Sequence, residues 1–273
     1  MYESYWKLQR PPFHGAPDVS SFCATRTHQG ALLKLRYLVE HRLGAGVLTG
    51  AHGLGKTFLT HVLEADIAPS AGPLARLVFP QMSPAELLAY LSAKLGAEPG
   101  HPQDTLRTDR VLAVLEHRLT RLAAEGRHPI LVIDEAQLLV PEQFQVLHLL
   151  LNISTEARSH FSLILVGEPD LIPRLQRNGA FDERFAVRTT LRPLSAEETG
   201  QYVASRLAHA GQPEPVFTAE ALAVLWELSQ GIPRRINQLC DLSLLVGFAD
   251  RLTSISPVEI EAAAEELLTV AVE

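Results

Sequence analysis

The sequence predicts an α/β protein with a three-layer core built on a parallel sheet and a small, all-helical domain toward its C-terminus. Two observations predict this fold class. Apolar runs that suit strands buried on both faces alternate with amphipathic helices up to Leu194, and only helical patterns follow from Ser195. We therefore expect an N-terminal strap at residues 1–30, an α/β core at residues 31–194 and a helical lid at residues 195–273.

The composition is that of an ordinary globular protein, because 47% of the 273 residues are hydrophobic and 20% are charged. Apolar runs such as residues 242–248 are much shorter than the roughly 20 residues that span a bilayer, and the first residues lack the pattern of a signal peptide. Cys23 and Cys240 have no C-x-x-C spacing, which favours reduced thiols over a disulfide or a metal site. We expect a cytoplasmic protein.

The charge balance bears on possible partners. A formal net charge of -7 disfavours, without excluding, a protein whose main task is to wrap nucleic acid, because phosphate backbones bind basic surfaces. A local basic patch would still allow DNA binding.

The chain begins with an irregular segment that carries Tyr2, Tyr5 and Trp6 among several prolines. We expect it to pack as a strap on another part of the protein. Residues 31–40 have apolar side chains at helical spacing, and residues 47–49 are typical of a short strand. A helix and then a strand are therefore expected to lead out of the strap.

The most informative segment is GAHGLGKT at residues 50–57, which fills the phosphate-binding pattern G-x-x-x-x-G-K-[ST]. It lies between the strand and an amphipathic helix at residues 58–63, as the motif requires. Glycines at 50, 53 and 55 allow positive φ angles, so backbone N–H groups can surround a phosphate at the helix N-terminus. Lys56 is expected to reach the β- and γ-phosphates, and Thr57 to ligate Mg²⁺. The candidate nucleotide-binding residues are Gly50, Ala51, His52, Gly53, Leu54, Gly55, Lys56, Thr57 and Phe58.

Several structural elements follow this phosphate loop. Residues 74–79 are predicted to form a second strand, and the capping box at residues 83–86 starts a helix that ends near Leu95. A polar, proline-rich loop is expected over residues 96–103 and a long amphipathic helix over residues 106–124.

The second functional signal is the apolar run Ile130 to Ile133, which is followed by Asp134 and Glu135. Such a run suits a strand buried on both faces, and carboxylates at the end of a buried parallel strand lie in the crevice where these sheets bind ligands. Asp134 is the candidate Mg²⁺ ligand beside Thr57, and Glu135 is the candidate base that polarises the attacking water. An apolar run followed by two acids indicates a nucleotide site only because a phosphate loop precedes it in the chain.

The rest of the core is expected to contain a helix at residues 141–152 and a buried strand at residues 161–167. No strand is assigned after it. The lid is expected to contain four helices. Their predicted limits are Ser195 to about Ala210, Thr218 to Leu228, Arg234 to about Phe248, and a last helix capped by Ser256-Pro257-Val258-Glu259.

These motifs resemble those of a AAA+ ATPase, with residues 50–57 as Walker A and residues 130–135 as Walker B. Over nearly all its length the chain resembles the ExeA-like ATPases of the general secretion pathway A type. This resemblance implies a P-loop NTPase core, a helical AAA+ lid, and ATP and Mg²⁺ as cofactors. It rests on Tyr2-x-x-Tyr5-Trp6-x-Leu8, Pro12-Phe13, Pro17-Asp18, Leu48-Thr49-Gly50, Asp134-Glu135-Ala136-Gln137 and Gly231-x-Pro233-Arg234-x-Ile236-Asn237.

The resemblance also implies roles for two arginines. Arg234 looks like the sensor-2 arginine that reaches from the lid to the γ-phosphate, and a cation at a helix start favours an anionic partner. Arg184 looks like the arginine finger presented to the ATP of a neighbouring subunit. Arg188 or Arg192 could serve instead, or Arg184 could form an internal ion pair. The candidate catalytic residues are thus Lys56, Glu135, Arg184 and Arg234.

One position departs from the family pattern. Where the family has Gly-Gln-Pro-Glu-Leu, this chain has Gly-Glu-Pro-Asp-Leu at residues 167–171. An ionised Glu168 beside the γ-phosphate would repel it, so Glu168 faces away, carries a proton or slows turnover. His52, at a variable position of the phosphate loop, is expected to face solvent rather than the phosphates.

The predicted function is an Mg²⁺-dependent ATP hydrolase, acting as a homo-oligomer, whose cycle drives conformational change or assembly of a partner. The resemblance implies secretion or pilus machinery as that partner, reached in the cytoplasm or peripherally at the inner membrane. An ATP-gated regulator of DNA transposition of the TniB and TnsC kind would share this core and a similar lid, although the net charge of -7 disfavours it. A nucleotide switch without turnover is left open by Glu168.

Overall fold

The computed structural model describes residues 1–13, 18–67, 72–97, 108–152 and 160–270. The predicted loop at residues 96–103 and the start of the helix predicted from residue 106 therefore lie largely outside the described residues. The chain forms two compact units, which are described separately below. An α/β unit comprises Thr27–His52 and Lys56–Leu191, and a helical unit comprises Met1–Arg26, Gly53–Gly55 and Arg192–Glu273.

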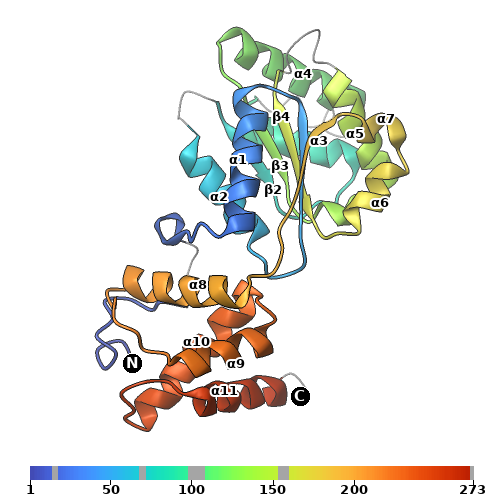
Figure 1. The fold of residues 1–273 in the computed structure, drawn as a ribbon. Coiled ribbons are helices and arrows are strands. Elements are labelled where there is room, and N and C mark those ends of the chain that lie inside the picture. Colours follow the sequence, from blue (N-terminus) through green and yellow to red (C-terminus); the bar gives the residue numbers. More distant parts are fainter. Residues whose placement is uncertain (14–17, 68–71, 98–107, 153–159, 271–273) are drawn as a thin grey trace. The chain divides into compact units, whose positions relative to one another are not determined.

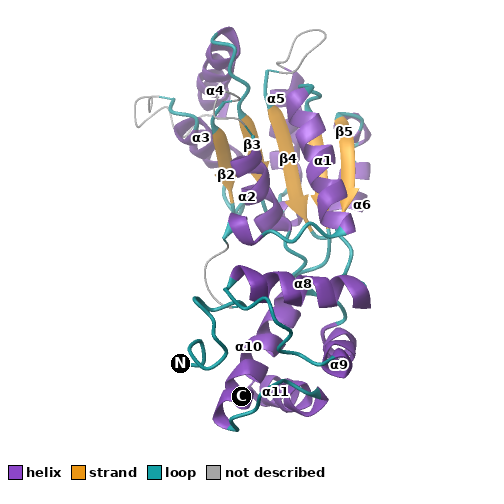
Figure 2. Cartoon of the chain, turned by 60° about the vertical axis from the view of Figure 1, so that its left-hand side comes forward, coloured by secondary structure: helices purple, strands orange, loops and turns teal. Residues whose placement is uncertain are grey.

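The α/β unit is built on a five-stranded sheet in the order β2-β3-β4-β1-β5, in which every pairing is parallel (Figure 2). The two strands that carry the sequence signals, β1 and β3, end at the phosphate loop and at Asp134. All described residues of β1, β3 and β4 are buried, as their unbroken apolar runs predict. The strands are β1 (Ala45–Thr49), β2 (Leu74–Leu77), β3 (Ile130–Ile133), β4 (Ser162–Gly167) and β5 (Phe185–Thr190).

Helices lie on both faces of this sheet, so the predicted three-layer α/β class is confirmed (Figure 1). Alternate strand residues such as Leu163 and Leu165 pack with buried side chains of α3 to α7, whereas α1 and α2 lie over the opposite face. The helices are α1 (Arg26–Glu40), α2 (Lys56–Asp66), α3 (Pro84–Lys94), α4 (Thr108–Ala124), α5 (Pro141–Asn152), α6 (Leu171–Gln176) and α7 (Gly179–Asp182), with a 3₁₀ turn η2 (Ala136–Leu138).

Two predicted details of the sheet are wrong. The strand predicted to reach Phe79 ends at Leu77, because its pairing with β3 ends there and Phe79 is 60% exposed. Strand β5 was not predicted from the sequence. Its residues alternate between buried and exposed, as in an edge strand covered on one face, so its sequence has no unbroken apolar run of the kind that marked β1, β3 and β4.

The described residues of the helical unit form four helices in its C-terminal part and one 3₁₀ turn in the strap. The predicted capping box at Ser195 is present, since the Ser195 side chain accepts from the backbone N of Glu198 and the Glu198 side chain accepts from the backbone N of Ser195. Thr218 caps the next helix, also as predicted. The elements are η1 (Val19–Ser21), α8 (Ala196–His209), α9 (Ala219–Ser229), α10 (Pro233–Ala249) and α11 (Pro257–Val270).

The strap contributes directly to the core of the helical unit. Trp6 is 4% exposed, and its indole Nε1 donates to the carbonyl O of Leu244 in α10 at 2.9 Å. The ring lies so close to Gly247 that a Cβ atom there would be 2.9 Å from it. Tyr2, Leu8 and Phe13 are buried in the same cluster. The expectation that the aromatic segment packs on another part of the protein is met by helices of its own unit.

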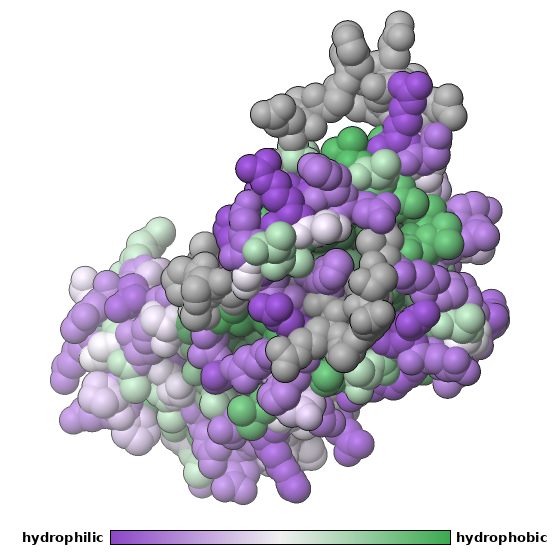
Figure 3. Space-filling model, turned by 90° about the horizontal axis from the view of Figure 1, so that it is seen from above, coloured by the Kyte–Doolittle hydropathy of each residue, from purple (hydrophilic) through white to green (hydrophobic). Residues whose placement is uncertain are grey.

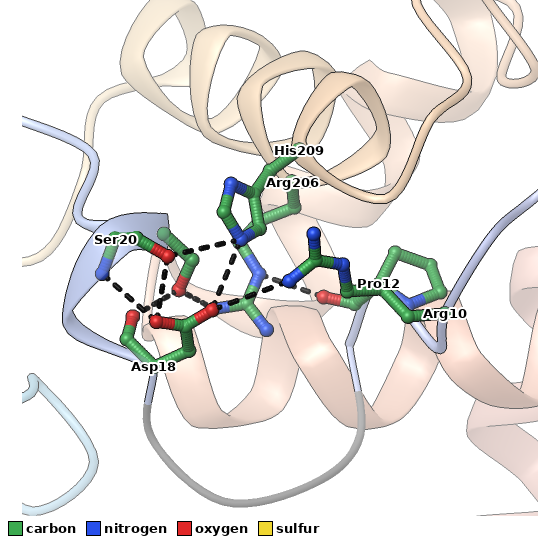
Figure 4. Close-up of polar contacts among 7 residues, drawn as sticks. Arg10, Pro12, Asp18, Ser20, Arg206 and His209 are labelled. Carbon is green, nitrogen blue, oxygen red and sulfur yellow. Dashed lines mark hydrogen bonds and ion pairs between the residues drawn. The ribbon is translucent and has the colours of Figure 1, made fainter.

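A polar network fastens the second part of the strap to α8 (Figure 4). The Asp18 carboxylate accepts from the Ser20 hydroxyl at 2.6 Å and lies 3.1 Å from Nε2 of His209. The hydrogen bonds from Ser20, followed by His209, lower the pKa of Asp18 to about 2. Arg206 donates from Nε to the carbonyl O of Pro12 at 2.7 Å. These groups hold the strap along one helix.

Hydrophilic residues predominate on the face of the molecule shown in Figure 3, where hydrophobic residues form smaller patches. Within the described residues, no helix combines the length and the apolar character needed to cross a bilayer.

Candidate functional site

The phosphate loop follows β1 and passes directly into α2. Positive φ angles occur at Gly53 (81°) and Gly55 (87°), as the motif predicts. The positive φ angle expected at Gly50 is not observed, so that part of the prediction is wrong. The backbone N of Gly50 instead donates to the carbonyl O of Gly167 at 3.3 Å, so Gly50 continues the contact between β1 and β4.

Lys56 is the first residue of α2 and is only 7% exposed. Its ammonium group donates to the carbonyl O atoms of Gly50 at 2.8 Å and Ala51 at 3.0 Å. Both acceptors are neutral, so these two bonds orient the charge without cancelling it. A buried cation at a helix N-terminus is suited to an anionic ligand such as a phosphate.

Thr57 and Asp134 are brought together by the fold. The Thr57 hydroxyl donates to Oδ2 of Asp134 at 2.5 Å, while Oδ1 of Asp134 accepts from the backbone N of Glu135 at 2.9 Å. Asp134 is 2% exposed, and its own backbone N donates to the carbonyl O of Leu77, which fixes the end of β3. A hydroxyl and a carboxylate in contact are the oxygen donors that a Mg²⁺ ion prefers, so these two residues fit that ion.

Glu135 follows in a left-handed backbone conformation, with φ 51° and ψ 37°. Its Oε2 atom accepts a hydrogen bond from Nε2 of Gln137 at 2.6 Å. The backbone N of Glu168, at the end of β4, donates to Oε1 of Gln137 at 3.1 Å. Gln137 was predicted only as part of the motif and not as a contact of Glu135. The two-residue spacing across a turn is the signal from which that contact could have been found.

Glu168 and His52 lie near each other at the mouth of the site. The distance from Oε1 of Glu168 to Nδ1 of His52 is 4.0 Å, and the side chains are 42% and 67% exposed, respectively. The exposure of His52 agrees with the expectation that it faces solvent. Glu168 directs its carboxylate toward the phosphate-loop histidine.

A cluster of charged and polar side chains joins α2 to β2. Arg76 contacts Nδ1 of His61 at 2.9 Å and donates to Oε2 of Glu64 at 2.9 Å. Burial, and then the positive charge of Arg76, lower the pKa of His61. His61 is therefore suited to accept a hydrogen bond from Arg76 as a neutral ring. The negative charges of Glu64 and then Asp134 act in the opposite direction and raise the pKa of His61.

The candidate finger arginines differ in their contacts. Arg184 is exposed and donates to the Oδ1 atom of Asn152 at the end of α5. Arg188, rather than Arg184, forms the ion pair with Asp182, at 2.8 Å. Arg192 is exposed and belongs to the helical unit. The contact of Arg184 with Asn152 lies outside the group formed by Thr57 and Asp134.

Arg234 lies in the first turn of α10, after Pro233, and is exposed. Inside the helical unit its backbone N donates to the carbonyl O of Gly53 at 3.2 Å. A Cβ atom at Gly53 would lie 2.9 Å from Ile232 and 3.1 Å from Arg234, so a side chain at that position would clash. Glycine at position 53 is thus required for packing as well as for its φ angle.

The residues described contain no group of three or more His, Cys, Asp or Glu side chains that could hold a metal ion by themselves. Any divalent cation at Thr57 and Asp134 would therefore complete its coordination with water and a ligand. Mg²⁺ at nucleotide sites is usually held in this way.

Comparison with known proteins identifies the same family as the motifs. Residues 39–175 match the family model described as an AAA domain. General secretion pathway protein A from Aeromonas hydrophila is 32% identical over 271 residues, a match that covers 98% of this chain and 48% of that protein. The chain therefore spans about half the length of this relative. The resemblance predicted from the sequence is confirmed.

Solved structures with the same fold are much more distant in sequence. Cdc6p from Pyrobaculum aerophilum superposes with a TM-score of 0.70 at 17% identity, over 91% of this chain and 71% of its own. The Aeropyrum pernix Orc1 protein in complex with DNA gives 0.65 at 18% identity, over 88% and 65% of the two chains. Drosophila ORC bound to DNA gives 0.70 at 19% identity, over 97% and 66%. These similarities establish the fold alone.

Proposed function

The chain belongs to the AAA domain family, and we propose that it binds ATP with Mg²⁺ and hydrolyses the bond to the γ-phosphate. One observation carries this proposal. The Thr57 hydroxyl lies 2.5 Å from the Asp134 carboxylate, and the preceding residue, Lys56, is buried with its ammonium group donating to two carbonyl O atoms of the loop. A hydroxyl, a carboxylate and a cation are the groups that bind a nucleoside triphosphate and its metal ion.

Each residue has a distinct role in this proposal. The amide groups of the loop after Gly50 and the Lys56 ammonium would bind the β- and γ-phosphates, and Thr57 and Asp134 would hold Mg²⁺. When bound, Mg²⁺ neutralises charge on the phosphate oxygens. Glu135 orients the attacking water and accepts its proton. Lys56 stabilises the charge that develops on the transferred group.

Two arginines extend the proposal beyond this site. Arg234 would respond to the γ-phosphate, and Arg184 would act as a finger on the ATP of a neighbouring copy. The support for Arg184 is its exposure and the fact that Asp182 is already paired with Arg188. Such an arrangement makes turnover depend on a homo-oligomer.

We further propose that the hydrolysis cycle changes the assembly of a protein partner in secretion or pilus machinery, in the cytoplasm or at the inner membrane. The support is the 32% identity to a protein named for the general secretion pathway, of which this chain covers 48%. Regulation of a DNA transaction is the alternative. It is favoured by the fold shared with DNA-bound Orc1 and ORC structures and disfavoured by the net charge of -7.

The first test is phosphate release from Mg²⁺-ATP as a function of protein concentration. We expect the specific activity to rise with concentration, Lys56→Ala to weaken ATP binding strongly and to abolish phosphate release, and Glu135→Gln to bind ATP without hydrolysing it. ATP binding without phosphate release at any concentration would refute hydrolysis by the chain alone. Salt-sensitive DNA binding that requires ATP would favour the alternative partner.

The finger is tested by mixing two inactive variants. Lys56→Ala does not hydrolyse ATP at its own site but retains Arg184, whereas Arg184→Ala binds ATP but lacks the finger. A mixture is expected to recover activity, because an Arg184 from one copy can complete the site of the other. Recovery with Arg192→Ala but not with Arg184→Ala would assign the finger to Arg192 instead.

Substitution of Glu168 tests whether its negative charge slows turnover. The Glu168 carboxylate approaches His52, and the Glu168 backbone N donates to Gln137. We expect Glu168→Gln to bind ATP as the unmodified chain does and to keep or raise turnover, since a negative charge near the phosphates is removed. A large loss of turnover would show that the carboxylate has a positive role.

A further inference from the structure

The Gln137 side chain forms a bridge between the ends of two neighbouring strands. Gln137 lies in η2, just after β3, and its Nε2 donates to Oε2 of Glu135 at 2.6 Å. Its Oε1 accepts from the backbone N of Glu168, just after β4, at 3.1 Å. Both ends of one amide are therefore hydrogen bonded, and one of them binds the proposed catalytic base.

The chemistry of the two partners fixes the orientation of this amide. The Glu135 carboxylate accepts from the Nε2 group, and the Glu168 backbone N–H can only donate, so the amide cannot be reversed without losing both bonds. Neither a hydrophobic side chain nor an acid of the same length could make the same pair of contacts. A glutamine is thus specifically suited to this position.

The surrounding backbone is shaped to admit the bridge. A Cβ atom at Gly167 would lie 2.6 Å from Oε1 of Gln137 and 3.3 Å from its backbone N, so a side chain at Gly167 would displace it. The carbonyl O of Gly167 accepts from the backbone N of Gly50, where the phosphate loop begins. The bridge therefore connects Glu135 to the strand end that also contacts the phosphate loop.

We propose that Gln137 is a positioning residue for the hydrolysis reaction. It fixes Oε2 of Glu135, so that the other carboxylate oxygen is presented to the attacking water, and it ties this orientation to the ends of β4 and β1. This inference rests on the proposed ATPase function and concerns the orientation of Glu135, not the binding of ATP.

The kinetic test compares Gln137→Met with a matched control. Methionine has a similar length but makes neither hydrogen bond. We expect kcat of Gln137→Met to fall by about 10- to 100-fold, because misplacement of a catalytic group by about 1 Å has effects of this size, while KM and the Kd for ATP change less than about twofold. Gln201 donates to Glu197 at 3.2 Å on the exposed surface of α8, and Gln201→Met should leave all three values unchanged.

A double substitution separates positioning from a general loss of structure. In a Glu135→Ala background, Gln137→Met is expected to change neither the residual phosphate release nor the Kd for ATP, because the carboxylate that it positions is absent. An additional loss there would overturn the inference, and so would an unchanged or raised kcat in the single variant. A raised kcat would mean that the bridge restrains Glu135 instead of presenting it.

The hydrogen bonds of Gln137 can also be tested by NMR, which does not depend on ATP hydrolysis. In the full chain labelled with ¹⁵N-glutamine, the side-chain amide signals of Gln137 are those lost in Gln137→Met. They should shift in Glu135→Ala and not in Glu197→Ala, whereas the signals of Gln201 should show the reverse. Unshifted Gln137 signals in Glu135→Ala would overturn the bridge. Absence of phosphate release by the unmodified chain would refute the proposed function and, with it, the catalytic role of the bridge.

Discussion

The two units obtain their cores from the sequence in different ways. In the α/β unit, strands and helices from Thr27 to Leu191 pack mainly with each other, apart from the three residues Gly53–Gly55. In the helical unit, buried side chains of the strap pack with helices from the opposite end of the chain. The α/β unit is nearly continuous in sequence, whereas the helical unit needs both ends of the chain.

The same difference appears in how polar groups are held. Thr57, Asp134, Glu135 and Gln137 are fixed by hydrogen bonds to one another or to backbone at strand ends. In the helical unit the notable polar contacts, such as Arg206 to Pro12, fasten the strap to a helix. These contacts of the α/β unit orient candidate site residues, whereas the contact of Arg206 in the helical unit attaches the strap to α8.

The largest expected effect tests the dependence of the helical unit on the strap. Trp6→Ala removes a side chain that is 4% exposed together with its hydrogen bond to Leu244, and should destabilise the helical unit by about 3–5 kcal/mol. Amide hydrogen exchange would show lost protection in α8 to α11 while β1 to β5 stay protected. Equal loss in the strands would mean that the two units unfold as one. The exposed Tyr37→Ala is the control within α1.

A buried histidine provides an effect confined to the α/β unit. His128 is 3% exposed and lies 2.9 Å from the Ser162 hydroxyl; burial and then Arg42 lower its pKa from 6.5 to about 4. As the pH falls from about 6.5 to 4, the unfolded chain binds a proton that the folded unit excludes, so stability falls by about 3 kcal/mol.

The pH effect is measured by urea unfolding at pH 7 and pH 4.5. His128→Gln should reduce the loss of stability on acidification, because the variant no longer has a group that protonates only when unfolded. The exposed His41→Gln should not change it. An unaltered pH dependence in His128→Gln would show that other groups govern acid unfolding.

The next effect concerns the site. Lys56→Ala should weaken ATP binding by about 100-fold, which corresponds to about 2.8 kcal/mol, without lowering the stability of either unit. Titration with a fluorescent ATP analogue measures the affinity. Lys94→Ala, at the exposed end of α3, is the control for loss of a lysine. Equal weakening by both substitutions would mean that Lys56 acts only through net charge.

The smallest expected losses of stability come from removing one helix capping box in each unit. Ser83 and Ser195 each form a complete capping box, in α3 and in α8. Alanine at either position should cost about 1 kcal/mol. Ser83→Ala should lower the protection of the α/β unit and Ser195→Ala that of the helical unit. If each variant lowered the protection of both units equally, the two units would unfold together and not independently.

Local signals made most of the α/β unit predictable. The phosphate loop, the buried run before Asp134 and the capping serines each act within a few residues, and each appears in the structure. Strand β5 was missed because an alternating edge strand has no unbroken apolar run. The bridge from Gln137 to Glu168 could not be predicted, since it depends on the neighbouring positions of β3 and β4 in the sheet.

The partner of the strap was unpredictable for a related reason. Aromatic residues such as Trp6 indicate burial, but no periodicity relates them to α10 at the far end of the chain. The same limit applies to Arg184 and Arg234, whose proposed roles depend on a neighbouring copy and on a nucleotide.

The position of the strap in the sequence also sets an order of events during protein synthesis. Ribosomes add roughly 5–20 residues per second, so the segment between the strap and α8 takes on the order of ten to thirty seconds to make. During that time the sheet can assemble, but Trp6 and its neighbours lack the helices that bury them. We therefore expect the helical unit to fold after the α/β unit, and the exposed aromatic segment to need protection by a chaperone until α8 to α11 have been made.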